Sequence, residues 1–159
     1  MFRLNKLADY GLVVMEYVAS QPEGHLHTAR SVAEATHLPA PTVVKILKKL
    51  LDRGLLVSHR GVNGGYMAAR ASSLISVAEV IEAIDGPLGL TECATAPGRC
   101  ELEGRCRIEA NFRVIGRLLH QTLRGISLSD LTALLNVTPK LPNPKNILTS
   151  ISLSSGGVQ

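Results

Sequence analysis

Aromatic side chains are scarce in this chain of 159 residues, which has no tryptophan, three tyrosines and two phenylalanines. Proteins that bind RNA or single-stranded DNA stack bases on aromatic rings, so this shortage argues against that class. No stretch approaches the roughly 20 apolar residues of a membrane-spanning helix. The N-terminal segment also has no apolar run typical of a signal peptide. We therefore expect a cytoplasmic protein without membrane partners.

Catalytic motifs are missing as well. The sequence shows no nucleophile paired with a base, no phosphate-binding loop and no paired carboxylates in a supporting context.

Positive charge, in contrast, is concentrated in one region. Residues 1–70 hold nine Lys/Arg against five Asp/Glu, whereas the remainder holds eight of each sign. We expect a non-enzymatic protein with a nucleic-acid-binding N-terminal part.

Hydrophobic periodicity predicts a mainly α-helical chain with a small β-hairpin. Gly11 is expected to mark a close helix crossing, and no internal repeat is recognised. The C-terminal residues 137–159 are rich in Pro, Ser and Gly and are expected to be disordered. We expect the hairpin over 55–69 and helices over 6–19, 29–36, 41–53, 77–85, 107–125 and 128–135, with an irregular segment over 88–107. Capping-box spacing stands at the start of two of these helices, in the pairs Ser31/Glu34 and Ser76/Glu79. Val13 is expected to broaden the buried face of helix 6–19, and the buried stripe of helix 41–53 is expected to be Val43, Ile46, Leu47 and Leu50.

Helix, tight turn, helix and hairpin is the order of a winged helix-turn-helix, in which the second helix of the pair enters the major groove of DNA. That helix is 41–53, and its polar face suits phosphates. The hairpin tip combines an arginine with glycines that allow close approach to a minor groove. Solvated lysines and a plain turn are the alternatives. The expected contacts to double-stranded DNA come from Pro41, Thr42, Lys45, Lys48, Lys49, Arg60, Gly61, Asn63 and Gly64.

Three cysteines, Cys93, Cys100 and Cys106, lie within 14 residues and are the only ones in the chain. An odd number in a cytoplasmic protein argues against a disulfide framework. Metal binding is favoured, although the gaps of six and five residues are too long for paired zinc knuckles. Iron–sulfur ligation, zinc and redox-active thiols all stay open from these residues alone.

An apolar seam runs along the predicted helix 107–125. Its members follow one another at steps of four and three residues, which is the pattern of a helix that packs on another helix. We expect a homodimer, whose two-fold symmetry would be mirrored in a pseudo-palindromic operator. The seam consists of Ile108, Phe112, Ile115, Leu119, Thr122 and Ile126.

Four features together resemble the winged-helix iron–sulfur transcriptional regulator family typified by IscR and NsrR, and most closely the regulators that accompany SUF assembly operons. Besides the three cysteines, the match rests on the residues 3–11, 60–66 and 75–87. The resemblance covers roughly residues 1–135. We expect the domains 1–87 (winged helix-turn-helix), 88–107 (cluster-binding loop) and 108–136 (dimerisation helix and short C-terminal helix), followed by the tail over 137–159.

The resemblance further implies that Cys93, Cys100 and Cys106 bind a [2Fe–2S] cluster, or a [4Fe–4S] cluster as in some members. Such a regulator senses cluster status and controls SUF- or ISC-type assembly genes. Two departures from the family pattern stand out. Six residues rather than five separate the first two cysteines, and Glu109 stands where assembly regulators have a histidine ligand. Nitric-oxide-sensing members instead use an acidic residue from the first helix of the partner subunit, which matches Asp9. A nitric-oxide or redox-stress repressor is the alternative function.

Overall fold

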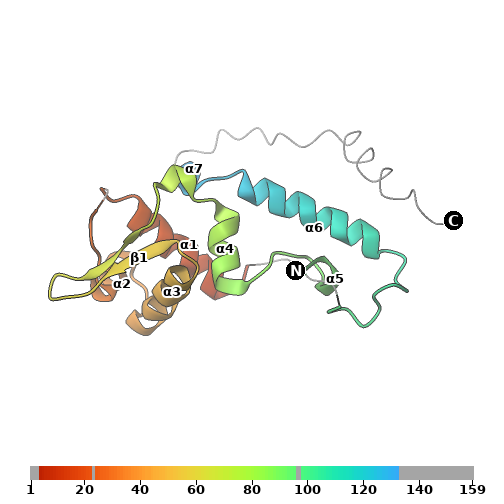
Figure 1. Cartoon of the computed structure of the whole chain (residues 1–159), viewed down its shortest axis with the longest axis horizontal. Coiled ribbons are helices and arrows are strands. Elements are labelled where there is room, and N and C mark those ends of the chain that lie inside the picture. The colour runs from red at the N-terminus through yellow and green to blue at the C-terminus, as the bar shows by residue number, and fades with distance from the viewer. Residues whose placement is uncertain (1–3, 23, 96–97, 133–159) are drawn as a thin grey trace.

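The computed structural model describes residues 4–22, 24–95 and 98–132. The mainly helical fold with one antiparallel hairpin is confirmed. Figure 1 shows a compact lobe that contains the hairpin, and a long helix, α6, that extends away from it with α5 alongside. In chain order the elements are α1 (Lys6–Ala19), α2 (Ala29–Thr36), α3 (Ala40–Asp52), β1 (Leu56–His59), β2 (Gly65–Ala68), a 3-10 turn (Ser72–Leu74), α4 (Val77–Asp85), α5 (Glu92–Thr95), α6 (Glu109–Arg124) and α7 (Leu128–Thr132).

Side-chain caps explain where several helices begin. The Asn5 side chain accepts a hydrogen bond from the Leu7 amide at the start of α1. Ser76 and Glu79 form the expected capping box at the start of α4. Each cap satisfies backbone N–H groups that the first helical turn leaves unpaired. At α2 the cap is Thr28.

The capping-box spacing of Ser31 and Glu34 does not mark the start of α2. Glu34 lies within the helix and pairs with Arg30 at 2.9 Å. The same pattern of residue types therefore serves here as a helical ion pair between positions i and i+4.

The core lies between α1, α3 and α4. The predicted apolar stripe of α3 is completely buried, as are Val14 and Met15 of α1. A Cβ on Gly11 would lie 2.8 Å from Ile84 Cγ1, so the predicted close crossing is confirmed as that of α1 over α4. Val13, expected to broaden the buried face of α1, is exposed. The stripe of α3 comprises Val43, Ile46, Leu47 and Leu50.

Some boundaries differ from the predicted ones. Helix α3 begins at Ala40 and α6 at Glu109. The segment expected to be irregular contains α5, which packs on α6 because Gly116 leaves room for Ala94; a Cβ at Gly116 would lie 3.1 Å from that of Ala94. The end of the predicted helix 128–135 and the tail over 137–159 lie outside the described residues. No helix in the described ranges has the length and hydrophobicity needed to cross a bilayer.

Candidate DNA-binding surface and cysteine site

Helix α3 presents a basic face opposite its buried stripe. Pro41, Lys45 and Lys48 are exposed, and Thr42 is half-buried. The N-terminus of the helix has no side-chain cap. Thr42 and Lys45 also line a groove of about 420 Å³ between the N-terminal ends of α1 and α3. The ammonium groups of this face are suited to phosphate oxygens. The backbone amides of the first turn contribute little, because Pro41 has no N–H and the amides of Thr42 and Val43 donate to Pro39 O.

Lys49 behaves differently from the other two lysines. Its side chain is half-buried, and its ammonium group donates a hydrogen bond to the backbone carbonyl of Ile84 near the end of α4. A cation at this position is favourable because helix C-termini carry partial negative charge. The expectation that all three lysines form one outward face available to DNA phosphates therefore needs revision. Lys49 has a partner inside the protein.

The end of α4 has a second polar contact with the lobe. The Asn5 amide nitrogen donates to Asp85 Oδ1 at 3.1 Å. Asn5 caps α1, and Lys49 belongs to α3. The residues from which the cysteine segment departs are therefore tied to both helices.

The wing is the hairpin β1–β2, with His59 opposite Gly65. Arg60, Gly61 and Asn63 are exposed at its tip. Gly61 has a φ of 127°, a backbone conformation that favours glycine. Gly64 has no room for a side chain, since a Cβ there would lie against His59 O and 2.9 Å from Gly61 O. The glycines thus have an internal role in shaping the tip in addition to the predicted approach to DNA.

A buried histidine supports the base of the wing. His27 and Tyr66 exchange two backbone hydrogen bonds of 2.8 Å. The His27 side chain is 2% exposed, its Nε2 has no hydrogen-bond partner among the described residues, and its ring lies against Tyr17 and His25. Burial, followed by the neighbouring His25, lowers the pKa of His27. Sequence reasoning gave no signal for this bridge, because His27 lies outside any periodic segment.

We expect the free energy of unfolding to fall as the pH drops below about 6.5, the ordinary pKa of histidine. The unfolded chain then binds a proton at residue 27, while the folded protein resists protonation until a lower pH. The slope contributed by one such group reaches at most about 1.4 kcal/mol per pH unit. Urea denaturation between pH 8 and 5 measures it. His27→Phe should flatten the curve, whereas the same substitution at the exposed His59 should leave it steep; equal slopes in both variants would contradict this assignment.

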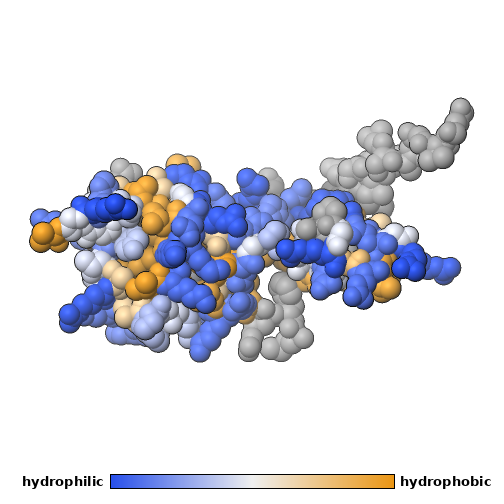
Figure 2. Space-filling model, turned by 60° about the horizontal axis from the view of Figure 1, so that its bottom comes forward, coloured by the Kyte–Doolittle hydropathy of each residue, from blue (hydrophilic) through white to orange (hydrophobic). Residues whose placement is uncertain are grey.

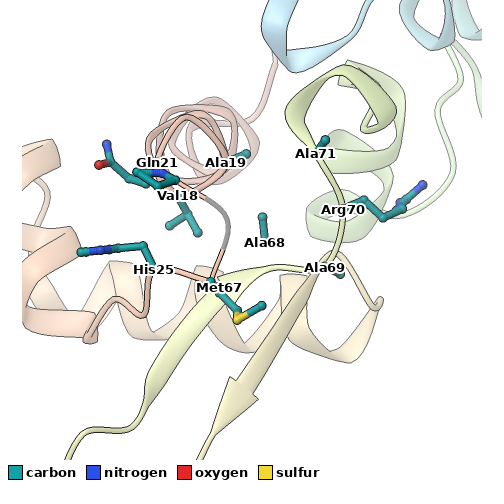
Figure 3. Close-up of a pocket in the computed structure, with 11 residues that line it drawn as sticks. Val18, Ala19, Gln21, His25, Met67, Ala68, Ala69, Arg70 and Ala71 are labelled. Carbon is teal, nitrogen blue, oxygen red and sulfur yellow. The ribbon is translucent and has the colours of Figure 1, made fainter.

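A cavity of about 250 Å³ lies between the end of α1 and the chain that leaves β2 (Figure 3). Its lining includes His25 and Met67, and otherwise consists largely of small or apolar residues. Arg70, the charged residue of the lining, is engaged by Glu79 at 2.9 Å. None of the predicted site residues lines this cavity, and we assign it no ligand.

Two of the three predicted ligands, Cys100 and Cys106, are free thiols and are partly buried. Cys93 lies on α5, and its side chain is outside the described residues. Among the described side chains, no group of three His, Cys, Asp or Glu residues lies close enough to hold a metal ion. The donor set nevertheless fits thiolate ligation in kind, because the sequence places three thiols in one short segment. Completing such a site requires Cys93.

The two candidate fourth ligands are in different situations. Asp9 is exposed on α1. Both carboxylate oxygens of Glu109 have partners: one accepts from the Gly104 amide at 2.8 Å and the other pairs with Arg113 at 2.8 Å. Glu109 would have to give up part of this network to bind a metal ion.

Solved structures of bacterial regulators share this fold. The global cysteine regulator CymR of B. subtilis is 24% identical, with a TM-score of 0.65 over 82% of this chain and 96% of that one. IscR of T. potens is 22% identical, with a TM-score of 0.62 over 82% of this chain and 85% of that one. The oxidized form of CymR from Staphylococcus aureus is 20% identical, with a TM-score of 0.62 over 86% and 100%.

The family comparison is more specific than these distant likenesses. The sequence profile of the Rrf2 family, described as an iron-dependent transcriptional regulator, matches residues 4–134. That range includes α3, the wing, the cysteine segment and α6. A winged-helix transcription factor is also the class of protein that the exposed basic face of α3 and the projecting hairpin indicate. The chain therefore belongs to the Rrf2 family of transcriptional regulators.

Proposed function

We propose that this protein is a cytoplasmic, homodimeric regulator that senses iron–sulfur cluster status and controls SUF- or ISC-type cluster assembly genes. The observation that carries the proposal is the position of the cysteine segment. It begins at the end of α4, which Lys49 and Asn5 tie to the DNA-binding lobe, and it runs into α6. The similarity to IscR of T. potens supports the same assignment.

Cys93, Cys100 and Cys106 would bind the cluster, of the [2Fe–2S] or the [4Fe–4S] type. When bound, an iron–sulfur cluster supplies a redox-active group whose reduction potential depends on its ligands and on its exposure to solvent. The protein's own contribution is a thiol loop held between two helices that reach the DNA-binding lobe and the proposed dimer interface. Exposed Asp9 is the better candidate for the fourth ligand, since Glu109 is already engaged by Arg113.

Helix α6 supports the homodimer because two parallel stripes run along it. One stripe faces the protein itself: Gly116 contacts α5, and His120 pairs with Glu82 of α4 at 3.2 Å. The predicted seam is the adjacent stripe, and Ile108 and Ile115 on it are exposed. In Figure 2 this part of the molecule shows hydrophobic patches between hydrophilic side chains. Ile126, the last residue of the predicted seam, lies beyond the end of α6 and packs against the core of its own protomer, so it does not belong to this face. A second α6 would bury the remaining members of the seam.

Each protomer would place α3 in the major groove and the wing in the adjacent minor groove of a pseudo-palindromic duplex. Thr42 and Lys45 lie near the helix N-terminus, where they would read base edges, and Lys48 would bind phosphate. At the wing, Arg60 would gain from the negative potential of a narrow minor groove.

The decisive experiment is an anaerobic absorption spectrum of freshly isolated protein, followed by operator binding at fixed salt. We expect a visible chromophore that is lost on replacing Cys93, Cys100 or Cys106 by alanine. Cluster loss should change operator affinity by about 5- to 150-fold, the usual range of coupling between two sites. Identical gel shifts of cluster-loaded protein and the triple-alanine variant would refute cluster sensing.

We expect Lys48→Ala and Lys49→Ala to differ. Lys48 is exposed, so its loss should weaken binding to every duplex and reduce the salt slope by about one. Lys49→Ala should instead lower protein stability, because the Ile84 carbonyl loses its partner. Fluorescence anisotropy in a salt titration and urea denaturation measure the two effects. Matching salt slopes and stabilities in the two variants would contradict this division. Lys45→Ala should relax sequence preference.

A redox-stress regulator without a cluster is the second candidate. It is favoured by the free, partly exposed thiols of Cys100 and Cys106 and by the similarity to CymR of S. aureus, which was solved in an oxidized form. A colourless anaerobic preparation whose DNA affinity responds to a thiol oxidant would support this alternative.

A further inference from the structure

The cysteine segment contains a short tandem repeat, although no internal repeat was expected. Residues 98–103 read GRCELE and residues 104–109 read GRCRIE. Each unit places a cysteine third, an aliphatic residue fifth and a glutamate sixth. The unit length of six is the reason for the spacing of Cys100 and Cys106.

The two units have the same local structure. Gly98 and Gly104 begin them with φ values of 79° and 78°. In each unit the glycine amide donates a hydrogen bond to the glutamate that ends it, Gly98 to Glu103 and Gly104 to Glu109. The aliphatic residues are exposed in both, 61% for Leu102 and 55% for Ile108. Equivalent residues therefore make equivalent contacts.

One arginine of α6 joins the two units. A single terminal nitrogen of Arg113 lies 2.6 Å from Glu103 Oε1 and 2.8 Å from Glu109 Oε1. The Arg113 side chain is about one third exposed, so the ion pairs are partly shielded from water. Charge-assisted hydrogen bonds of this length are the strong ones in proteins, and they add geometric specificity.

We propose that residues 98–109 and Arg113 form a clasp that holds Cys100 and Cys106 as a matched pair, which makes Arg113 a positioning residue for the cysteine site. In each unit, one carboxylate oxygen accepts the hydrogen bond from the glycine amide two residues before the cysteine. The other oxygen binds Arg113. The pair is thus ordered by the protein alone. That the two thiols serve to bind a cluster rests on the proposed function; the clasp itself does not.

The clasp assigns Glu109 a structural role equal to that of Glu103. Glutamine at either position keeps the size of the side chain and an oxygen acceptor but removes the charge that binds Arg113. Because the units are equivalent, Glu103→Gln and Glu109→Gln should have similar effects. A metal ligand at Glu109 would instead make the second substitution much more damaging to the chromophore than the first.

The test uses the reduced, cluster-free, full-length chain and N-ethylmaleimide, with mass spectrometry reporting the alkylation rate of each cysteine. In Arg113→Met we expect the rates of Cys100 and Cys106 to rise together by about tenfold, as the loop opens more often. Cys93 should keep its rate, because the packing of Ala94 on Gly116 holds α5. Arg117→Met, at an exposed arginine of the same helix, is the matched control and should behave as wild type.

Wild-type rates in Arg113→Met would overturn the clasp. An equal increase in the alkylation rate of all three cysteines would also overturn it, because the cysteine segment, α5 and α6 would then loosen together. Far-UV circular dichroism would reveal the accompanying loss of α6. A protein that never shows a chromophore but keeps the paired response of Cys100 and Cys106 would refute the proposed function and support the clasp.

Discussion

Replacing Ile115 by aspartate is expected to convert the proposed dimer into monomers that remain folded. Ile115 is 43% exposed in the single chain, so an aspartate there stays hydrated in the protomer. In a dimer closed by the seam of α6, the carboxylate of each protomer would be buried without a partner. An unpaired buried charge costs several kcal/mol, so we expect the dimer dissociation constant to rise by at least about 100-fold. Sedimentation velocity at micromolar concentration measures the change.

Operator binding should be lost when the proposed dimer dissociates, because a single protomer would bring only one α3 to the proposed pseudo-palindromic duplex. Leu74→Asp is a suitable control, because Leu74 is an aliphatic residue that is 65% exposed and lies outside α6. It should leave both association and operator affinity unchanged. A wild-type sedimentation coefficient for Ile115→Asp would exclude this stripe as the dimer interface.

Gly65→Ala should destabilise the wing and weaken DNA binding together. A Cβ at this position would lie 2.6 Å from the backbone oxygen of His27, a distance that real Cβ atoms do not show. To make room, the backbone at residue 65 must move away from His27, and we expect this movement to weaken the two hydrogen bonds between His27 and Tyr66. Overpacking and the weakened bonds together give an expected loss of about 2–4 kcal/mol in the free energy of unfolding. Urea denaturation measures this loss, and anisotropy on operator DNA measures the binding.

Gly125→Ala provides the comparison. The nearest atoms to a Cβ there lie at 3.5 Å, an ordinary contact, and its φ of −79° suits any residue. That variant should retain wild-type stability within about 0.5 kcal/mol. If Gly65→Ala were equally stable, the wing would not depend on its bridge to His27.

The parts of the fold that the sequence predicted are those with a repeating signal. In α3, four apolar residues at helical spacing pointed to one buried face, and all four are buried. The capping box of Ser76 and Glu79 likewise located the start of α4. Helix α5 was missed because its four residues are too few for periodicity, and its packing on Gly116 is a contact with a distant residue.

The candidate site shows the same division. Exposure of Lys45 and Lys48 follows from their place on the amphipathic helix, but the partner of Lys49 lies 35 residues away and could not be inferred from spacing. The repeat around Cys100 and Cys106 is present in the amino-acid sequence itself. Cysteine spacing alone does not indicate it, because the repeat lies in the glycine, aliphatic residue and glutamate that flank each cysteine. Its meaning depends on Arg113, which only the fold brings to both glutamates.

The anchored end of α4 has a mechanical consequence. This helix of nine residues is about 13 Å long, so a tilt of about 10° moves its end by about 2 Å. Its opposite end is fixed by backbone hydrogen bonds that join Val77 and Ile75 to the chain entering α7. A movement of 2 Å exceeds what a hydrogen bond tolerates. A displacement of the segment after Asp85 therefore has two possible results: α1 and α3 move with the end of α4, or the contacts of Lys49 and Asn5 break. In this way a gradual displacement leads to one of two discrete states.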